Sequence, residues 1–113
     1  MTALGSEAVP LPLRLHRDHL YVEAPVFEAH LAHVRSVALL RDGDDLLILP
    51  VITAEAGGFL IKQVNARGDR AIHAADFFRL NRIDENHRYD LAARRHEATG
   101  GFIIRNVFRP SAN

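Results

Sequence analysis

The chain has 113 residues, of which 48% are hydrophobic and 25% are charged, and its fourteen basic residues balance its fourteen acidic ones. This composition excludes a disordered polypeptide and predicts one folded domain. The lack of cysteine excludes disulfide scaffolds and thiolate chemistry. The longest apolar run, over residues 46–52, is too short to span a membrane. No basic segment followed by an apolar one opens the chain, so we expect a cytoplasmic protein with no membrane partner.

The first part of the chain predicts an arm, a strand and a short helix. Residues 1–13 contain glycine and two prolines without periodicity, which indicates an N-terminal arm. A strand-like mixture follows from Leu15 to Glu23, and Pro25 then suits the first turn of a helix. Apolar residues recur at helical spacing on one face of this segment, over residues 25–34: Phe27, Leu31 and Val34.

A β-hairpin is predicted in the middle of the chain. Two apolar runs, Val37–Leu40 and Leu46–Val51, are separated by Arg41–Asp45, which contains an Asp-Gly pair. Asp-Gly between apolar runs favours a tight turn, because glycine accepts a positive φ and aspartate can bond the nearby backbone. The unbroken apolar character indicates strands that are covered on both faces, so we expect this hairpin to form the core.

The remaining elements follow glycines 57 and 58, which we interpret as a turn. In chain order they are a strand at Phe59–Val64, a turn at Asn65–Asp69, an extended piece at Arg70–His73, a helix at Ala74–Asn81, a loop at Asp84–His87, a period-2 strand at Tyr89–Arg94, a glycine turn at Gly100–Gly101, a strand at Phe102–Val107 and a tail at 110–113. Short strands with two small helices predict an α+β domain over residues 14–109. We expect it to be mainly antiparallel β, as a small barrel or a sandwich-like fold.

Charge is unevenly distributed along the chain. Residues 1–58 carry four basic and eight acidic groups, whereas residues 59–113 carry ten basic and six acidic groups, so the halves have net charges of −4 and +4. One interpretation is that the halves complement each other within one fold or a dimer. The other is that the second half presents a basic face to an anionic partner.

The second half resembles a known family. Its residues read as a strand at Phe59–Asn65, a basic glycine turn at Arg67–Arg70, a second strand at Ala71–Ala74, a helix with the run Phe77–Ile83, and a closing glycine turn and apolar strand at Gly100–Ile104. In that order, residues 59–104 resemble the swapped-hairpin domain of the AbrB and SpoVT transition-state regulators and antitoxins.

The resemblance implies a dimer of interleaved hairpins whose basic side chains face DNA. The residues that would contact DNA are Lys62, Arg67, Arg70, Arg79 and Arg82. Guanidinium groups suit this role because they bind phosphate bidentately and can also bond guanine edges. The alternative is that these residues are exposed side chains that pair with the acidic first half.

Histidine is the second candidate for chemistry, with seven in the chain. His30 and His33 are three residues apart, so on a helix they would project from neighbouring positions, as metal-ligating histidines do. His16 and His19 show the same spacing. The alternative is that these histidines simply lie on the surface.

No catalytic residues are predicted, because the chain lacks a nucleophile elbow, a phosphate loop and a dinucleotide fingerprint. The favoured hypothesis is therefore a non-enzymatic interaction module without a cofactor, with AbrB-like DNA binding as its most concrete form. The alternatives are an accessory or assembly protein that binds a protein partner, and a histidine-dependent metal-binding protein. A homodimer is expected, because short strands leave sheet edges that need cover.

Overall fold

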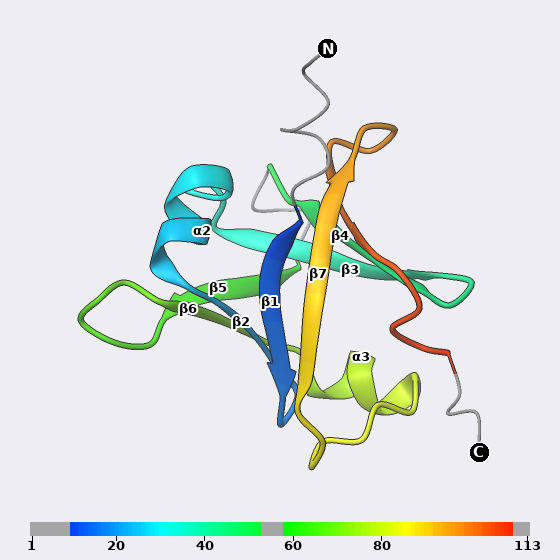
Figure 1. The fold of residues 1–113 in the computed structure, drawn as a ribbon. Helices are drawn as coiled ribbons and strands as arrows, with labels where there is room; N and C mark the ends of the chain where they lie inside the picture. Colours follow the sequence, from blue (N-terminus) through cyan, green and yellow to red (C-terminus); the bar gives the residue numbers. More distant parts are fainter. Residues whose placement is uncertain (1–9, 53–57, 110–113) are drawn as a thin grey trace.

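Eight antiparallel strands close into a barrel, in the order β1-β2-β6-β5-β3-β4-β8-β7 (Figure 1). This computed structural model describes residues 10–52 and 58–109. The strands are β1 (Leu11–His16), β2 (His19–Val22), β3 (Ser36–Asp42), β4 (Asp45–Pro50), β5 (Phe59–Gln63), β6 (Arg70–His73), β7 (Tyr89–His96) and β8 (Gly101–Ile104), and the helices are α2 (Ala24–His30) and α3 (Ala75–Leu80). The prediction of a mainly antiparallel α+β domain with two short helices, in its small-barrel form, is confirmed.

The two halves of the chain contain the same succession of elements. Each is a unit of hairpin, helix and hairpin: β1–β2, α2 and β3–β4 in the first, and β5–β6, α3 and β7–β8 in the second. Around the barrel the β5–β6 hairpin lies between β2 and β3 of the first unit. Exchanging the two units, β1 for β5 through β4 for β8, reproduces the same circular order. The topology therefore has twofold symmetry, with the units interleaved.

The barrel is filled by alternate strand residues and by one phenylalanine from each helix. Leu20 and Ile72 lie opposite each other on β2 and β6, and both are buried. Phe27 of α2 and Phe78 of α3 belong to the same hydrophobic cluster as these strand residues. Both units therefore contribute to a single core, and neither can bury its apolar face alone.

The first predicted strand is a tight hairpin in the structure. Residues 15–23 were expected to be continuous, but Arg17 and Asp18 form a turn between β1 and β2 with φ values of 52° and 64°. Left-handed conformations favour glycine, asparagine and aspartate, so Asp18 suits its place, but Arg17 does not and the pair lacks the glycine that usually marks such a turn in a sequence. β1 also begins at Leu11, inside the segment expected to be an arm, because it pairs with β7.

The other boundaries agree more closely with the prediction. The β3–β4 hairpin turns at Gly43, which has a φ of 64°, as the Asp-Gly signal predicted. The last strand ends at Ile104, before the predicted Val107, because the Asp45 carboxylate binds the next turn. Its Oδ1 accepts the backbone N–H of Asn106 at 2.9 Å.

Some predictions concern residues that the structure does not describe. They are residues 1–9 of the expected arm, the glycine at position 57 and the tail at 110–113. Neither helix in the described ranges has the length and apolar character needed to cross a membrane.

Candidate functional site

The β5–β6 hairpin carries three of the five basic residues predicted to contact DNA. Figure 1 shows its turn projecting from one side of the barrel. On β5, Ile61 pairs with buried Ile72, so the neighbouring Leu60 and Lys62 point outward. Lys62 makes no ion pair with any residue in 10–52 or 58–109. Its ammonium group is therefore available to an anion in solution.

The turn after β5 is held by hydrogen bonds between its own side chains. Asn65 Oδ1 accepts the backbone N–H of Arg67 at 3.0 Å and that of Asp69 at 3.2 Å. The other side of the turn is closed by Asp69 Oδ2, which accepts Asn65 Nδ2 at 2.9 Å and Arg67 Nη2 at 3.1 Å. Such Asx bonding fixes the turn in one shape.

Asp69 also ties this turn to α2. Its Oδ1 accepts the backbone N–H of Ala24, the first residue of the helix, at 2.8 Å. The hydrogen bond from the Asn65 side chain, followed by the Ala24 N–H, lowers the pKa of Asp69 below its ordinary value of 3.8. The carboxylate therefore stays ionised through the neutral and mildly acidic range.

The two arginines of this hairpin differ in exposure. The Arg67 side chain is 82% exposed, although one nitrogen contacts Asp69. Arg70 is half-buried, with its guanidinium 4.2 Å from the centre of the Phe27 ring and Nη1 donating to the Gly68 carbonyl at 2.7 Å. Arg67 can therefore reach a ligand, whereas Arg70 mainly fixes the hairpin against α2.

The other two predicted DNA contacts lie at α3, away from the β5–β6 turn (Figure 1). Arg79 Nη2 lies 3.3 Å from Asp18 Oδ2 and 3.4 Å from Glu85 Oε1, so two carboxylates already hold it. Arg82 follows the helix with a φ of 63°, and its side chain makes no ion pair with a described residue. The structure therefore separates the five predicted residues into two groups.

Ion pairs also join the two halves of the chain. Arg79 with Asp18 and Arg105 with Asp45, at 3.1 Å, each link a base from the second half to an acid from the first. Asp18 is 2% exposed, and its Oδ1 has no hydrogen-bond partner among the described residues. These pairs support the interpretation in which opposite charges complement each other inside one fold.

The predicted metal ligands are not accompanied by further donors. His30 ends α2 and contacts the edge of the Phe102 ring at 6.3 Å between centres, while His33 is exposed in the following turn. Within the described ranges, no group of three or more histidine, aspartate or glutamate side chains is arranged to hold an ion. A metal site at His30 and His33 stays a prediction that rests on two ligands.

Three other histidines form a row on the outer face of the barrel. His16 pairs with His19 across β1 and β2, and His19 pairs with His73 across β2 and β6. The His19 and His73 rings are stacked, 4.3 Å apart and 8° from parallel. His19 Nδ1 also lies 2.7 Å from the Arg17 carbonyl oxygen. The spacing of His16 and His19 in the sequence therefore reflects a hairpin and not a helix.

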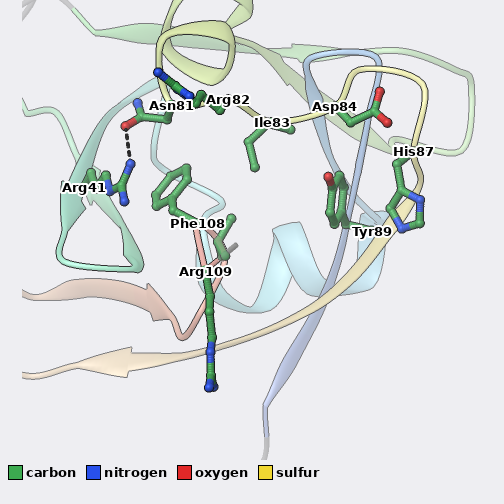
Figure 2. A pocket seen from close by; sticks show the side chains of 10 residues that line it. Arg41, Asn81, Arg82, Ile83, Asp84, His87, Tyr89, Phe108 and Arg109 are labelled. Atoms are coloured by element: carbon green, nitrogen blue, oxygen red, sulfur yellow. Dashed lines mark hydrogen bonds between the residues drawn. The ribbon is translucent and has the colours of Figure 1, made fainter. Parts of the chain in front are cut away.

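A pocket of about 750 Å³ opens where three distant segments meet (Figure 2). The β3–β4 hairpin, the connection from α3 to β7 and the chain after β8 supply its walls: Arg41, Asn81, Arg82, Ile83, Asp84, His87, Tyr89, Val107, Phe108 and Arg109. Except for Arg82, sequence reasoning assigned none of these residues to a site. They share no motif or spacing that could have revealed it.

Comparisons with protein-family models, curated proteins and solved structures found no match to this chain.

Proposed function

We propose that the protein is a non-catalytic binding module that contacts duplex DNA through its β5–β6 hairpin. The observation that carries this proposal is the projecting β5–β6 hairpin: Lys62 on β5 makes no ion pair with a described residue, and the Arg67 side chain in the turn is 82% exposed. Two-stranded β-ribbons fit a DNA groove, and basic side chains along them neutralise phosphates. Because Asn65 and Asp69 already fix the turn, binding would cost little conformational entropy.

The order of the elements also supports the proposal. The resemblance to the AbrB and SpoVT domain implies interleaved units of hairpin, helix and hairpin from two chains. Here, one chain supplies two such units. The described strands leave no barrel edge uncovered, so the edges that motivated a homodimer are already paired. Homodimerisation stays a prediction, which light scattering of the full chain would test.

Arg67 and Lys62 are assigned the direct phosphate contacts in this proposal. Arg67 would exchange its contact with Asp69 for a phosphate. Breaking that ion pair should cost little free energy, because both side chains reach solvent. Arg70 would act as a positioning residue through its stack on Phe27. Arg79 and Arg82 would contact DNA only if the duplex extended around the barrel toward α3.

Fluorescence anisotropy with a labelled 30-base-pair duplex tests the proposal. Affinity should fall linearly with salt on a double logarithmic scale, with a slope of about −0.9 per phosphate contact. The double variant Lys62→Ala, Arg67→Ala should weaken binding by about tenfold or more and make that slope shallower by about 2. Arg95→Ala is the matched control, since it removes an exposed charge from β7.

Two results would contradict the proposal. One is a wild-type protein that does not bind duplex DNA at 50 mM salt. The other is a loss of binding free energy per removed charge that is the same in the double variant, which removes two charges, and in Arg95→Ala, which removes one, because this would indicate only a response to net charge.

A second candidate, an accessory protein that binds another protein, is favoured by apolar residues on the same hairpin. Leu60 is 59% exposed and Val64 is 50% exposed, and they flank Lys62 on the outer face. They also line a shallow pocket of about 430 Å³ with His19 and His73. Exposed aliphatic groups contribute little to phosphate binding, whereas they are typical of protein contacts.

The substitution Leu60→Ser separates the two functions. It should leave DNA affinity within about twofold of the wild type, because it removes no charge. If the protein instead binds one stoichiometric partner from its native source, the same variant should release that partner. A large loss of DNA affinity in Leu60→Ser would argue against a phosphate-based interface.

A further inference from the structure

The pocket below the β3–β4 hairpin has fixed cationic and aromatic walls. Arg41 is held from several sides: Nε donates to the Gly43 carbonyl at 2.6 Å, Nη1 donates to Asn81 Oδ1 at 3.2 Å, and Nη2 lies 3.6 Å from Asp44 Oδ1. Its guanidinium carbon lies 4.9 Å from the centre of the Phe108 ring. An arginine positioned in this way has already lost most of its rotational freedom, so it can bind an anion at low entropic cost.

Arg82 supplies a second cation on the same side of the pocket as Arg41 and Asn81 (Figure 2). It adopts a left-handed backbone conformation, which is uncommon for a residue other than glycine or asparagine. No described residue forms an ion pair with its side chain. The guanidinium of Arg82 is therefore an unpartnered donor at the rim of the pocket.

Aromatic rings form two further walls of the pocket, which lie opposite each other. Figure 2 shows Phe108 on one side of the hollow and Tyr89 on the other, with Ile83 between them. Tyr89 is half-buried, and the His87 ring contacts it edge-on with 4.5 Å between centres. A planar ring placed between these groups would bury apolar surface and keep its edge accessible to polar partners.

The charge of the lining selects the kind of anion. Three arginines line the pocket, Arg41, Arg82 and Arg109, against a single carboxylate, that of Asp84. Figure 2 shows Arg109 extended away from the side of the pocket that carries Arg41 and Arg82. Asp44 lies outside the lining, but its Oδ1 is 3.6 Å from Arg41 Nη2 and offsets part of the Arg41 charge. The pocket remains net positive, which favours an anion such as a phosphate monoester, with close to two negative charges at pH 7.

We propose that this pocket binds a small aromatic phosphate of mononucleotide size. Arg41 and Arg82 bind the phosphate, and Phe108 and Tyr89 contact the ring. The volume of about 750 Å³ lies within the range of about 300–1,000 Å³ that is usual for small-molecule sites. The site shares Arg82 with the five predicted DNA contacts, but it is separate from Lys62 and Arg67, the direct phosphate contacts of the proposed function, because the β5–β6 hairpin lies on another side of the barrel (Figure 1).

Isothermal titration calorimetry of the full chain with three probes tests both parts of the proposal. AMP carries ring and phosphate, adenosine lacks the phosphate, and ribose 5-phosphate lacks the ring. AMP should bind at least tenfold more tightly than either of the other two. If adenosine equals AMP, the arginines do not bind phosphate, and if ribose 5-phosphate equals AMP, the rings contribute nothing. Either equality, or no binding of AMP below 1 mM, would overturn the proposal.

Amide chemical shifts locate the site. With AMP, the perturbed resonances should cluster at residues 81–89 and 107–109 and around Arg41. Shifts confined to the β5–β6 hairpin would assign the nucleotide to the DNA-binding surface and overturn the proposal. The double variant Lys62→Ala, Arg67→Ala should retain AMP affinity within about twofold, so a failed DNA assay and a failed AMP assay are separate results.

A matched pair of substitutions tests the role of the unpartnered arginine. Arg82→Asn removes the charge with a residue that tolerates positive φ, so the fold should be retained. It should weaken AMP binding by about tenfold. Arg95→Asn removes an exposed charge at the far end of β7 from Tyr89 and should change affinity by less than about twofold. Equal effects of the two substitutions would overturn the assignment of Arg82.

Discussion

The β1–β2 and β5–β6 turns occupy equivalent places in the two interleaved units, and each meets the first turn of the other unit's helix. At β1–β2 the contact uses backbone: the Asp18 carbonyl accepts the N–H of Ala74, just before α3, at 2.9 Å. At β5–β6 it uses a side chain: Asp69 Oδ1 accepts the N–H of Ala24 at 2.8 Å. In both units an aspartate of the turn therefore accepts a backbone N–H at the start of the other unit's helix, through its carbonyl in one case and its carboxylate in the other.

The surroundings of the two aspartates differ even more. Asp18 is 2% exposed, pairs with Arg79 and leaves Oδ1 without a partner among the described residues. The Asp69 side chain is 21% exposed, and donors from Ala24, Asn65 and Arg67 surround its oxygens. Of the two aspartates, the more buried one therefore has fewer hydrogen-bond donors around its carboxylate. The satisfied acid is in the projecting turn, where it fixes the shape of the proposed DNA contact.

The largest expected losses of stability come from the feature that the two units share. In each unit a short helix inserts one phenylalanine into the core. Phe78 is 0% exposed and Phe27 is 7% exposed. Phe78→Ala should lower the free energy of unfolding by about 3–5 kcal/mol, because it removes the ring and leaves a cavity. Phe27→Ala should cost a similar amount if the units contribute equally. Urea denaturation of both variants measures this, and a loss below about 1 kcal/mol in either would show that its helix is not part of the cooperative core.

Asp69→Asn should produce the next largest effect. At pH 7 it should lower the thermal midpoint by a few degrees, since the charged acceptor of three donors is lost. The folded-state pKa of Asp69 lies below its ordinary value, so its stabilisation is present above that value and disappears as the pH falls through the lowered pKa. The difference between wild type and variant should therefore be constant above about pH 6 and shrink toward pH 2. Calorimetry across this range would refute the idea if the difference grew on acidification.

Arg70→Lys should have a smaller effect on stability, because it changes only the contact between the β5–β6 hairpin and α2. A lysine keeps the charge but loses the flat guanidinium over the Phe27 ring and the hydrogen bond to Gly68. The expected loss of stability is about 0.5–1 kcal/mol. Arg14→Lys is the matched control, because its guanidinium lies 5.5 Å from the Tyr21 ring, a longer contact. Equal losses in both variants would argue against a specific stack at Arg70.

The smallest effect on stability is expected from a substitution of Asp18, whose Oδ1 has no hydrogen-bond partner among the described residues. Asp18→Asn keeps a side chain that suits the φ of 64° and removes a poorly paired buried charge. Arg79 would not be left buried, since its side chain is 62% exposed and keeps its contact with Glu85. Stability at pH 7 should therefore change by less than about 1 kcal/mol, or rise. A loss above about 2 kcal/mol in chemical denaturation would show that the carboxylate holds the hairpin in place.

The sequence was sufficient to predict an element where neighbouring residues alone set the backbone conformation. The Asp-Gly pair predicted the β3–β4 turn, because glycine at position 43 accepts the positive φ found there. Helical spacing predicted α2, although the helix ends at His30 and not at residue 34. The β1–β2 turn has no such local signal, because it contains no glycine and Arg17 is left-handed; its backbone bonds to Glu85 and Ala74 are tertiary contacts.

The candidate sites show the same division. The sequence pointed to Lys62 and Arg67 only through the resemblance of residues 59–104 to the AbrB and SpoVT domain, which depends on the local order of elements. The sequence could not point to the aromatic phosphate pocket, because Arg41, Arg82 and Phe108 come from segments far apart in the chain.

The amino-acid sequence by itself determined the kinds of element in this protein, because hydrophobic period and turn chemistry act over a few residues. Tertiary structure decided which strands are neighbours. The pairing of β1 with β7 closes the barrel, and the insertion of β5–β6 between β2 and β3 interleaves the two units. These pairings depend on burying two incomplete apolar faces in one core, and that free energy exists only once both units are present.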